Sequence, residues 1–223
     1  MKPEDIESAS FNIIDAEVGN HDFDEPQWSI VRRMIHTTAD FEFKDMVRIH
    51  PEAIAAGIQA IRSGEMIITD TNMARVGIRT KELAQFGVTV KCYMNDPRIH
   101  EKAKSNGTTR AKAAVDMAAN DMKDGIYVIG NAPTALLRLI ELINEGKARP
   151  ALIIGLPVGF VNAAESKAAL MEMDYPYISN LGRKGGSNLA ASVVNALILL
   201  TDQSPGAESR EQRAEDRGQH TAE

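Results

Sequence analysis

The sequence predicts an α/β protein: a single domain with an open, mainly parallel sheet, helices on both faces of that sheet, and two further helices ahead of it. From Pro51 onward, short aliphatic runs alternate with helical stretches of about ten residues or more, a pattern typical of βα units. Hydrophobic residues make up 43% of the chain but aromatic residues only 5%, so the core must be mainly aliphatic. A chain of 223 residues is long enough to bury such a core.

Two helical patterns open the chain. Residues 2–18 have a proline and acidic residues where a helix would begin, and an apolar face through Ile6, Ile13 and Ile14. Residues 25–36 again have a proline near the start, followed by apolar residues at helical spacing. We therefore expect two helices before the sheet begins.

The remaining chain is expected to form helices that each feed a short strand. The predicted strands are residues 66–70, 88–94, 125–130, 151–157 and 175–180. The predicted helices are residues 51–64, 80–86, 108–121, 132–146, 162–173 and 187–200. Because right-handed crossovers join parallel strands, the carboxyl ends of all these strands should lie along one edge of the sheet.

The last segment differs from the rest. Residues 201–223 contain no Val, Ile, Leu, Met or aromatic residue, and they mix six acidic side chains with three arginines. Such a segment cannot bury enough apolar surface to offset the entropy of ordering. We therefore expect a domain of residues 1–200 and a disordered, acidic and polar tail of residues 201–223.

Composition excludes several classes of function. The net charge of −6 and the lack of a basic run argue against binding of nucleic acid. The single cysteine, Cys92, excludes an internal disulfide and a cysteine-rich zinc site. No apolar run approaches the roughly 18 residues of a membrane span, and the first residues lack the apolar core of a signal peptide. We expect a cytoplasmic protein that does not enter a membrane.

Glycine-rich and polar turns follow the predicted strands, where ligands of open parallel sheets bind. They are Asp70, Asn95–Asp96 and residues 130–134, 155–159 and 182–188. Each is more commonly an ordinary turn, but several along one edge indicate a large cleft. The fingerprints G-x-x-x-x-G-K-[ST], G-x-G-x-x-G and G-x-S-x-G are missing, and His36 and His50 are not spaced as metal ligands. Hydrolase, kinase and zinc-enzyme functions lose support, whereas a methyltransferase with a weak glycine motif stays open.

Several charged residues can be interpreted in two ways. Arg33 and His36 fall in the last turn of the second predicted helix, where the helix dipole favours cations, so both could be ordinary charges at a helix end. His36 could instead be a partly buried packing residue, or the proton donor of an active site. Arg110 begins a predicted helix, where the dipole favours anions; it could be solvated or could bind a ligand carboxylate. Glu165 and Lys167 fall in a first helical turn and are expected at the surface or in a capping role.

Five segments together resemble one known family, the precorrin-8X methylmutases, also called cobalt-precorrin-8 methylmutases. They are SFNII from Ser10, VRRMIH ending at His36, GNAPTALL from Gly130, GLPVGFVNAAESKAAL from Gly155 and GRKGGSNLAASVVNAL from Gly182. The resemblance runs from about Ser10 to about Leu200, and the fourth segment alone is highly specific.

The resemblance implies an isomerase of cobalamin biosynthesis. Family members move a methyl group from C11 to C12 of a tetrapyrrole, giving hydrogenobyrinate, or cobyrinate when cobalt is present. They need no separate cofactor and no protein-bound metal, and they form homodimers with active sites near the interface. By the resemblance, His36 is the proton donor and acceptor, while Ser10, Arg33 and Arg110 contact the substrate.

These residue types suit that chemistry. A methyl shift around a conjugated ring is assisted when a proton on the ring system draws electron density, and histidine can give and take back a proton near neutral pH. Arginines can hold the acetate and propionate groups at the ring periphery, and the apolar residues 156–160 can cover the ring face. Whether the substrate carries cobalt stays open.

Two other hypotheses remain. A non-catalytic corrinoid carrier would need the arginines but not the imidazole, so the intact segment ending at His36 favours catalysis. An enzyme that binds a nucleotide or S-adenosylmethionine is disfavoured by the missing fingerprints.

Overall fold

A six-stranded, mainly parallel sheet forms the centre of the computed structural model, which describes residues 3–203. The strands are β1 (Val47–Ile49), β2 (Ile67–Thr69), β3 (Val90–Cys92), β4 (Ile126–Ile129), β5 (Leu152–Gly155) and β6 (Tyr177–Asn180). Their order is β1-β6-β5-β4-β2-β3, and every neighbouring pair is parallel except β1 with β6. The predicted fold class is confirmed.

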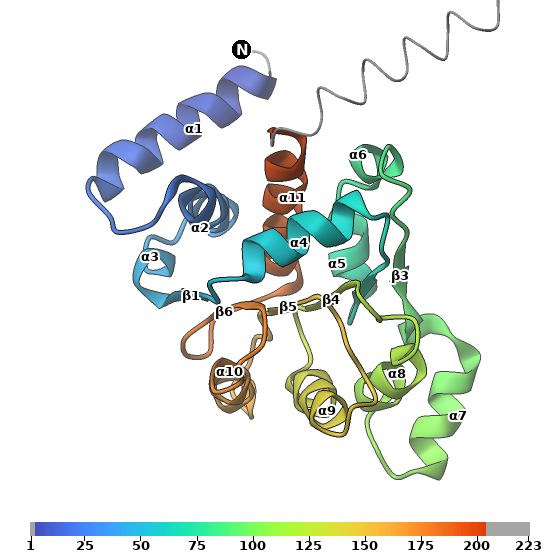
Figure 1. Ribbon diagram of the computed structural model, residues 1–223. Helices are drawn as coiled ribbons and strands as arrows, with labels where there is room; N and C mark the ends of the chain where they lie inside the picture. Colours follow the sequence, from blue (N-terminus) through green and yellow to red (C-terminus); the bar gives the residue numbers. More distant parts are fainter. Residues whose placement is uncertain (1–2, 204–223) are drawn as a thin grey trace, which may run out of the picture.

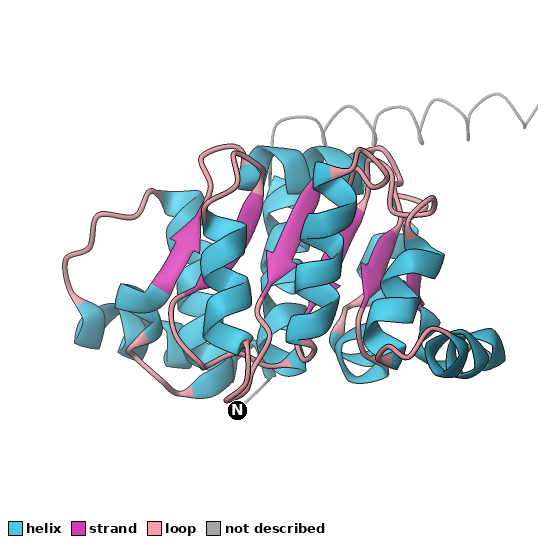
Figure 2. Cartoon of the chain, turned by 90° about the horizontal axis from the view of Figure 1, so that it is seen from below, coloured by secondary structure: helices cyan, strands magenta, loops and turns pink. Residues whose placement is uncertain are grey.

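Helices cover both faces of this sheet (Figure 1). On one face lie α2 (Glu25–Thr38), α4 (Ala53–Arg62), α5 (Asn72–Gly77), α6 (Thr80–Ala84) and α11 (Ser187–Gln203), with α1 (Pro3–Val18) and α3 (Phe43–Met46) beside α2. On the other face lie α7 (Pro97–Ser105), α8 (Arg110–Ala118), α9 (Pro133–Asn144) and α10 (Ala163–Met171), and a 3-10 turn (Tyr93–Asn95) leads into α7. Figure 2, the view from below, shows the strands running behind a layer of helices.

The strands divide the core into two parts because successive side chains point to opposite faces. Ile67, Val128 and Ile154 pack into one cluster with α2, α4 and α11. Ile68 and Ile153 pack into another with α8, α9 and α10. Every residue of β2, β4 and β5 is buried, which explains the continuous aliphatic runs of the sequence.

The last helix runs further than predicted. Buried positions recur along α11 to Thr201, which is 1% exposed and whose hydroxyl donates to the carbonyl of Leu197. The helix continues to Gln203, three residues past its predicted end at Leu200. The rest of the predicted tail, residues 204–223, lies outside the described residues.

Five elements were not predicted because they are short or polar: β1, α3, α5, the 3-10 turn and α7. Strand β1 has only three residues and lies at the sheet edge, antiparallel to β6. Helix α7 buries only Ile99 and Ala103; it begins after Asp96, whose carboxylate accepts from the backbone N–H of Arg98. Asp96, predicted to line the ligand cleft, therefore has a capping role.

Candidate active site

The centre of the sheet's carboxyl edge is filled by the protein's own groups. The strand order of the sheet reverses between β2 and β4: β3 follows β2 on one side, and β4, β5 and β6 follow on the other. Open α/β sheets usually bind their ligands at such a position. There the buried carboxylate of Asp70 accepts from the backbone N–H groups of Gly130, Asn131 and Ala132 at 2.8–2.9 Å. Burial raises the pKa of Asp70, and these three hydrogen bonds oppose that effect.

Close backbone packing leaves little room at the same place. A Cβ atom added to Gly130 would lie 2.6 Å from the Cα of Ser187, where α11 begins. Only glycine fits so near a neighbouring backbone. The glycine-rich turn after β4, considered a candidate ligand loop, is thus used to pack α11 against the sheet.

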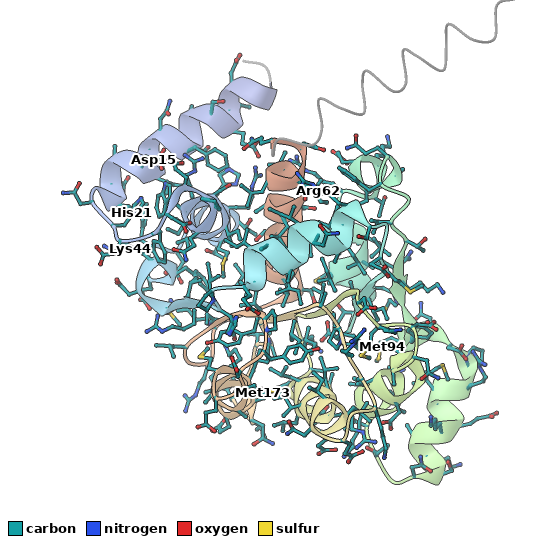
Figure 3. The ribbon with its side chains drawn as sticks, viewed as in Figure 1. Asp15, His21, Lys44, Arg62, Met94 and Met173 are labelled. Carbon is teal, nitrogen blue, oxygen red and sulfur yellow. The ribbon has the colours of Figure 1, made fainter. Side chains whose placement is uncertain are left out.

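The predicted site residues Ser10, Arg33 and His36 lie elsewhere, on the packed pair of helices α1 and α2. Asp15 of α1 binds this pair together: it accepts from Trp28 Nε1 at 2.9 Å and from Arg32 at 2.8 Å. Figure 3 labels Asp15 on α1 and His21 in the link between the helices. Helix α2 itself begins with a capping box, in which Asp24 and Gln27 satisfy each other's backbone N–H groups.

His36 sits in the last turn of α2 and is partly exposed. Its ring meets Phe11 of α1 edge-on, with centroids 5.3 Å apart. The helix continues through Thr37 and Thr38, past the point where its apolar pattern breaks, and their hydroxyl groups donate back to the carbonyls of Arg33 and Met34. The imidazole is therefore held by a packed helix end and remains accessible to a ligand.

Arg33 is buried, with its side chain only 9% exposed. Its guanidinium donates to Glu7 of α1 at 2.5 Å and lies 5.0 Å from the Phe11 ring centroid. Burial alone would raise the pKa of Glu7, but Arg33, with weaker contributions from the charges of Arg79 and His36, lowers it below its usual value. Glu7 is thus a carboxylate held among cations.

Ser10 lies one turn along α1 from Glu7 and is partly exposed. Its hydroxyl donates to the carbonyl of Ile6 at 2.8 Å. A serine hydroxyl has two lone pairs, so it can still accept a hydrogen bond from a ligand. The structure places Ser10, Arg33 and His36 on the same helix pair.

Arg110 is not brought to the other three within one chain. It is exposed at the start of α8, which lies across the sheet from α2 (Figure 1). The preceding Thr109 caps this helix by accepting from the N–H of Lys112. The C-terminal end of α2 and the N-terminal end of α8 nevertheless both lie near the carboxyl edge of the sheet. Asp40, just after α2, binds Lys184 in the loop after β6, and Thr109, just before α8, contacts Thr134 after β4.

The loop after β5 presents apolar side chains to solvent. Phe160 is 86% and Val161 77% exposed, and the guanidinium of Arg183 lies 5.8 Å from the Phe160 ring centroid. The backbone N–H of Gly159 donates to the Arg183 carbonyl, and this hydrogen bond joins the loop after β5 to the loop after β6. An exposed ring beside a cation is suited to an apolar ligand that carries anionic groups.

Lys167 was wrongly expected at the surface. It is fully buried, and its ammonium donates to the carbonyl of Lys184 at 2.5 Å and to Asn180 Oδ1 at 3.3 Å. Burial lowers its pKa to about 8. Helical spacing gives the missed signal, because Lys167 shares one face of α10 with Ala163 and Leu170, both of which are also buried.

Lys167 indirectly supports the end of α2. The ammonium of Lys167 donates to the Lys184 carbonyl and so holds the loop after β6. The ammonium of Lys184 in turn binds Asp40 and Glu42, which lie just after α2, at 2.5 and 2.9 Å. Glu165, in contrast, is exposed as expected.

Across residues 3–203, no group of three or more histidine, cysteine, aspartate or glutamate side chains is placed to hold a metal ion. In the same range, no helix is both long enough and apolar enough to cross a bilayer.

Known proteins resemble this chain over most of its length. The family described as precorrin-8X methylmutase matches residues 5–200. A cobalt-precorrin-8 methylmutase of Priestia megaterium is 47% identical, over 91% of this chain and 90% of the relative. A precorrin-8X methylmutase of a Sinorhizobium species is 37% identical, over 86% of this chain and 92% of the relative. A crystal structure of precorrin-8x methyl mutase from Thermus thermophilus, 46% identical, superposes with a TM-score of 0.82 and covers 89% of this chain and 96% of its own.

Proposed function

The chain belongs to the precorrin-8X methylmutase family, and on that premise we propose that it is a methyl-shifting isomerase of cobalamin biosynthesis in which His36 moves the proton. The substrate is the tetrapyrrole precorrin-8 or its cobalt form, and the methyl group passes from C11 to C12. The reaction takes place in the cytoplasm and needs no separate cofactor. The product is hydrogenobyrinate, or cobyrinate when cobalt is present.

The observation that supports this role is the placement of His36 beside Arg33 on a rigid helix end. In the reaction, the bond from the methyl group to C11 breaks as the bond to C12 forms. A proton donated by His36 to the ring system draws electron density through the conjugated path, and the same imidazole takes the proton back afterwards. The substrate and product are isomers, so no other reactant is consumed.

Binding follows from the neighbouring groups. Arg33 and Ser10 contact the substrate, Arg33 through a peripheral carboxylate, for which a guanidinium fork is suited. The apolar loop that carries Phe160 covers one face of the ring. These roles are supported by the burial of Arg33 and the exposure of Phe160 and Val161.

We further propose a homodimer in which Arg110 of one copy completes the site of the other. The separation of Arg110 from His36 across the sheet supports this arrangement, since one chain does not bring them together. Most homodimers are two-fold symmetric, so each copy would give and receive one arginine.

The experiment that tests the activity is conversion of precorrin-8X and of its cobalt form, followed by the absorption spectrum. The wild-type protein is expected to give the product spectrum. His36→Ala should lower turnover by about 10²–10⁴, the usual contribution of a general acid–base group. His50→Ala, which changes a histidine beside the start of β6 at the opposite edge of the sheet, is the matched control and should match wild type.

Other results would contradict the proposal. Tight binding of both substrate forms without conversion by wild type would show a corrinoid carrier. Equal turnover by wild type and His36→Ala would remove the histidine from the mechanism. Binding of S-adenosylmethionine or a nucleotide in place of the tetrapyrrole would assign a different class of enzyme.

A further inference from the structure

Two arginines from different elements converge on one carboxylate oxygen. Oε1 of Glu7 lies 2.5 Å from the guanidinium of Arg33 on α2 and 3.8 Å from that of Arg79, in the link between α5 and α6. The Arg33 side chain is 9% exposed, whereas those of Glu7 and Arg79 are 36% and 38% exposed. The point of convergence can therefore be reached from solvent.

We propose that Arg33 and Arg79 form a binding site for one peripheral carboxylate of the substrate, and that Glu7 occupies this site in the free protein. The site is called the arginine cradle below. This inference rests on the proposed function for the identity of the ligand, and it adds Arg79 as a substrate-binding residue and Glu7 as a competitor for the same place.

The two arginines are the anchored members of the cradle. Arg33 belongs to α2, which packs along α11. The backbone N–H of Arg79 donates to Asn195 Oδ1 of α11 at 2.9 Å, and Asn195 Nδ2 donates back to the Gly77 carbonyl at 2.9 Å. Both arginines are thus fixed to the same buried helix.

Glu7 is attached more loosely. Its helix α1 packs mainly against α2 and buries Ile14, while Ile6 and Ile13 are 52% and 57% exposed. Phe11 and Val18 are only partly buried, so this helix gains less from tertiary packing than the helices that cover the sheet, and local movements are drawn from such regions. Glu7 is accordingly the member that a ligand can displace.

Charge and position also support a ligand carboxylate here. One carboxylate is shared by two guanidinium groups, so the cradle keeps an excess of positive charge when Glu7 is present. His36 is close enough for its charge to influence Glu7. A carboxylate held in the cradle would place the attached ring beside the imidazole, and arginine is the side chain best suited to bind carboxylates.

The cradle is tested with the full-length protein, by titration with the product acid and with a derivative whose carboxylates are converted to primary amides. Arg79→Met is expected to weaken binding of the acid about tenfold, as for loss of a charge-assisted hydrogen bond. It should not change binding of the amide. Arg75→Met, an exposed arginine one turn earlier on α5, is the matched control and should change neither.

Glu7→Gln separates competition from structural support. Removing the competing charge is expected to strengthen binding of the acid about threefold, the scale of a partly exposed ion pair. Glu17→Gln, an exposed glutamate on the same helix, should have no effect. Circular dichroism and thermal unfolding show that each variant is folded, and Arg79→Lys, which keeps the charge, should recover part of the affinity.

Each result decides between the two proposals. The cradle is overturned if Arg79→Met binds the acid as wild type does, if it loses acid and amide equally, or if Glu7→Gln weakens binding. Wild-type turnover tests the isomerase activity separately. If the protein binds the acid through Arg79 but does not convert the substrate, the proposed cradle is supported and the proposed activity is contradicted. Absence of any binding by wild type would overturn both.

Discussion

The centre of the carboxyl edge and the α1–α2 pair use buried charge in opposite ways. At the edge, Asp70 is buried and its carboxylate is satisfied by three backbone N–H groups of the neighbouring loop. In the α1–α2 pair, Arg33 is also buried, but its partner Glu7 is partly exposed and shared with Arg79. The first arrangement joins two neighbouring loops through a buried carboxylate, whereas the second forms the proposed binding site for a ligand carboxylate.

This difference shows that the fold class alone does not locate the site. Open parallel sheets usually bind ligands where the chain order reverses. Here that place is filled by Asp70 and by the packing of Ser187 on Gly130. The proposed chemistry instead uses helices that precede the sheet, which the sheet and α11 hold in place.

The largest expected effect on stability comes from breaking the closed edge. Asp70→Ala would leave the N–H groups of residues 130–132 without their acceptor in a buried place. We expect the free energy of unfolding to fall by about 3 kcal/mol, measured by urea titration. Asp96→Ala, which removes a partly exposed capping carboxylate after the neighbouring strand, is the control and should cost much less. If Asp70→Ala and Asp96→Ala lowered the free energy of unfolding equally, Asp70 would contribute no more than an ordinary helix-capping residue.

A smaller effect on stability is expected for Lys167, the buried lysine that supports the end of α2, and it should depend on pH in a defined direction. The pKa of Lys167 falls from 10.5 to about 8 on folding, so the unfolded chain binds more protons between these values. Stability contributed through Lys167 therefore rises with pH from about 8 to about 10.5. Urea unfolding at several pH values should show wild type gaining stability over Lys167→Met across this range.

Lys184 supplies a control of opposite sign. Hydrogen bonds to Asp40 and Glu42 raise its pKa on folding, so its contribution is present below its ordinary pKa and is lost as pH rises through the raised value. The stability difference between wild type and Lys184→Met should therefore shrink toward high pH. If both lysine variants showed the same pH dependence, the assignment of Lys167 as a strongly desolvated ammonium would be wrong.

The same contrast explains what the sequence could predict. Strands β4 and β5 were predictable because burial on both faces requires continuous aliphatic residues. Strand β1 was not, since three residues at a sheet edge, one of them the exposed Arg48, carry no such pattern. Helix α7 is mostly polar, and its few buried residues give no clear periodicity.

For the candidate site, the motif ending at His36 indicated the helix that carries Arg33 and the imidazole. The sequence did not show that Glu7 and Arg79 meet at Arg33, because these residues are far apart in the chain and belong to no common motif. Nor could it show that Arg110 lies across the sheet, since that depends on the path of the chain between β3 and β4.

The most direct test of the proposed two-chain site is a mixture of His36→Ala and Arg110→Ala subunits, refolded together and assayed for methyl migration. If Arg110 acts on the other copy, each mixed dimer regains one intact site, and a random mixture should recover about a quarter of wild-type turnover from two nearly inactive parents. If the mixture stays no more active than the average of its parents, Arg110 does not complete the site of the partner, and the two-chain arrangement is contradicted.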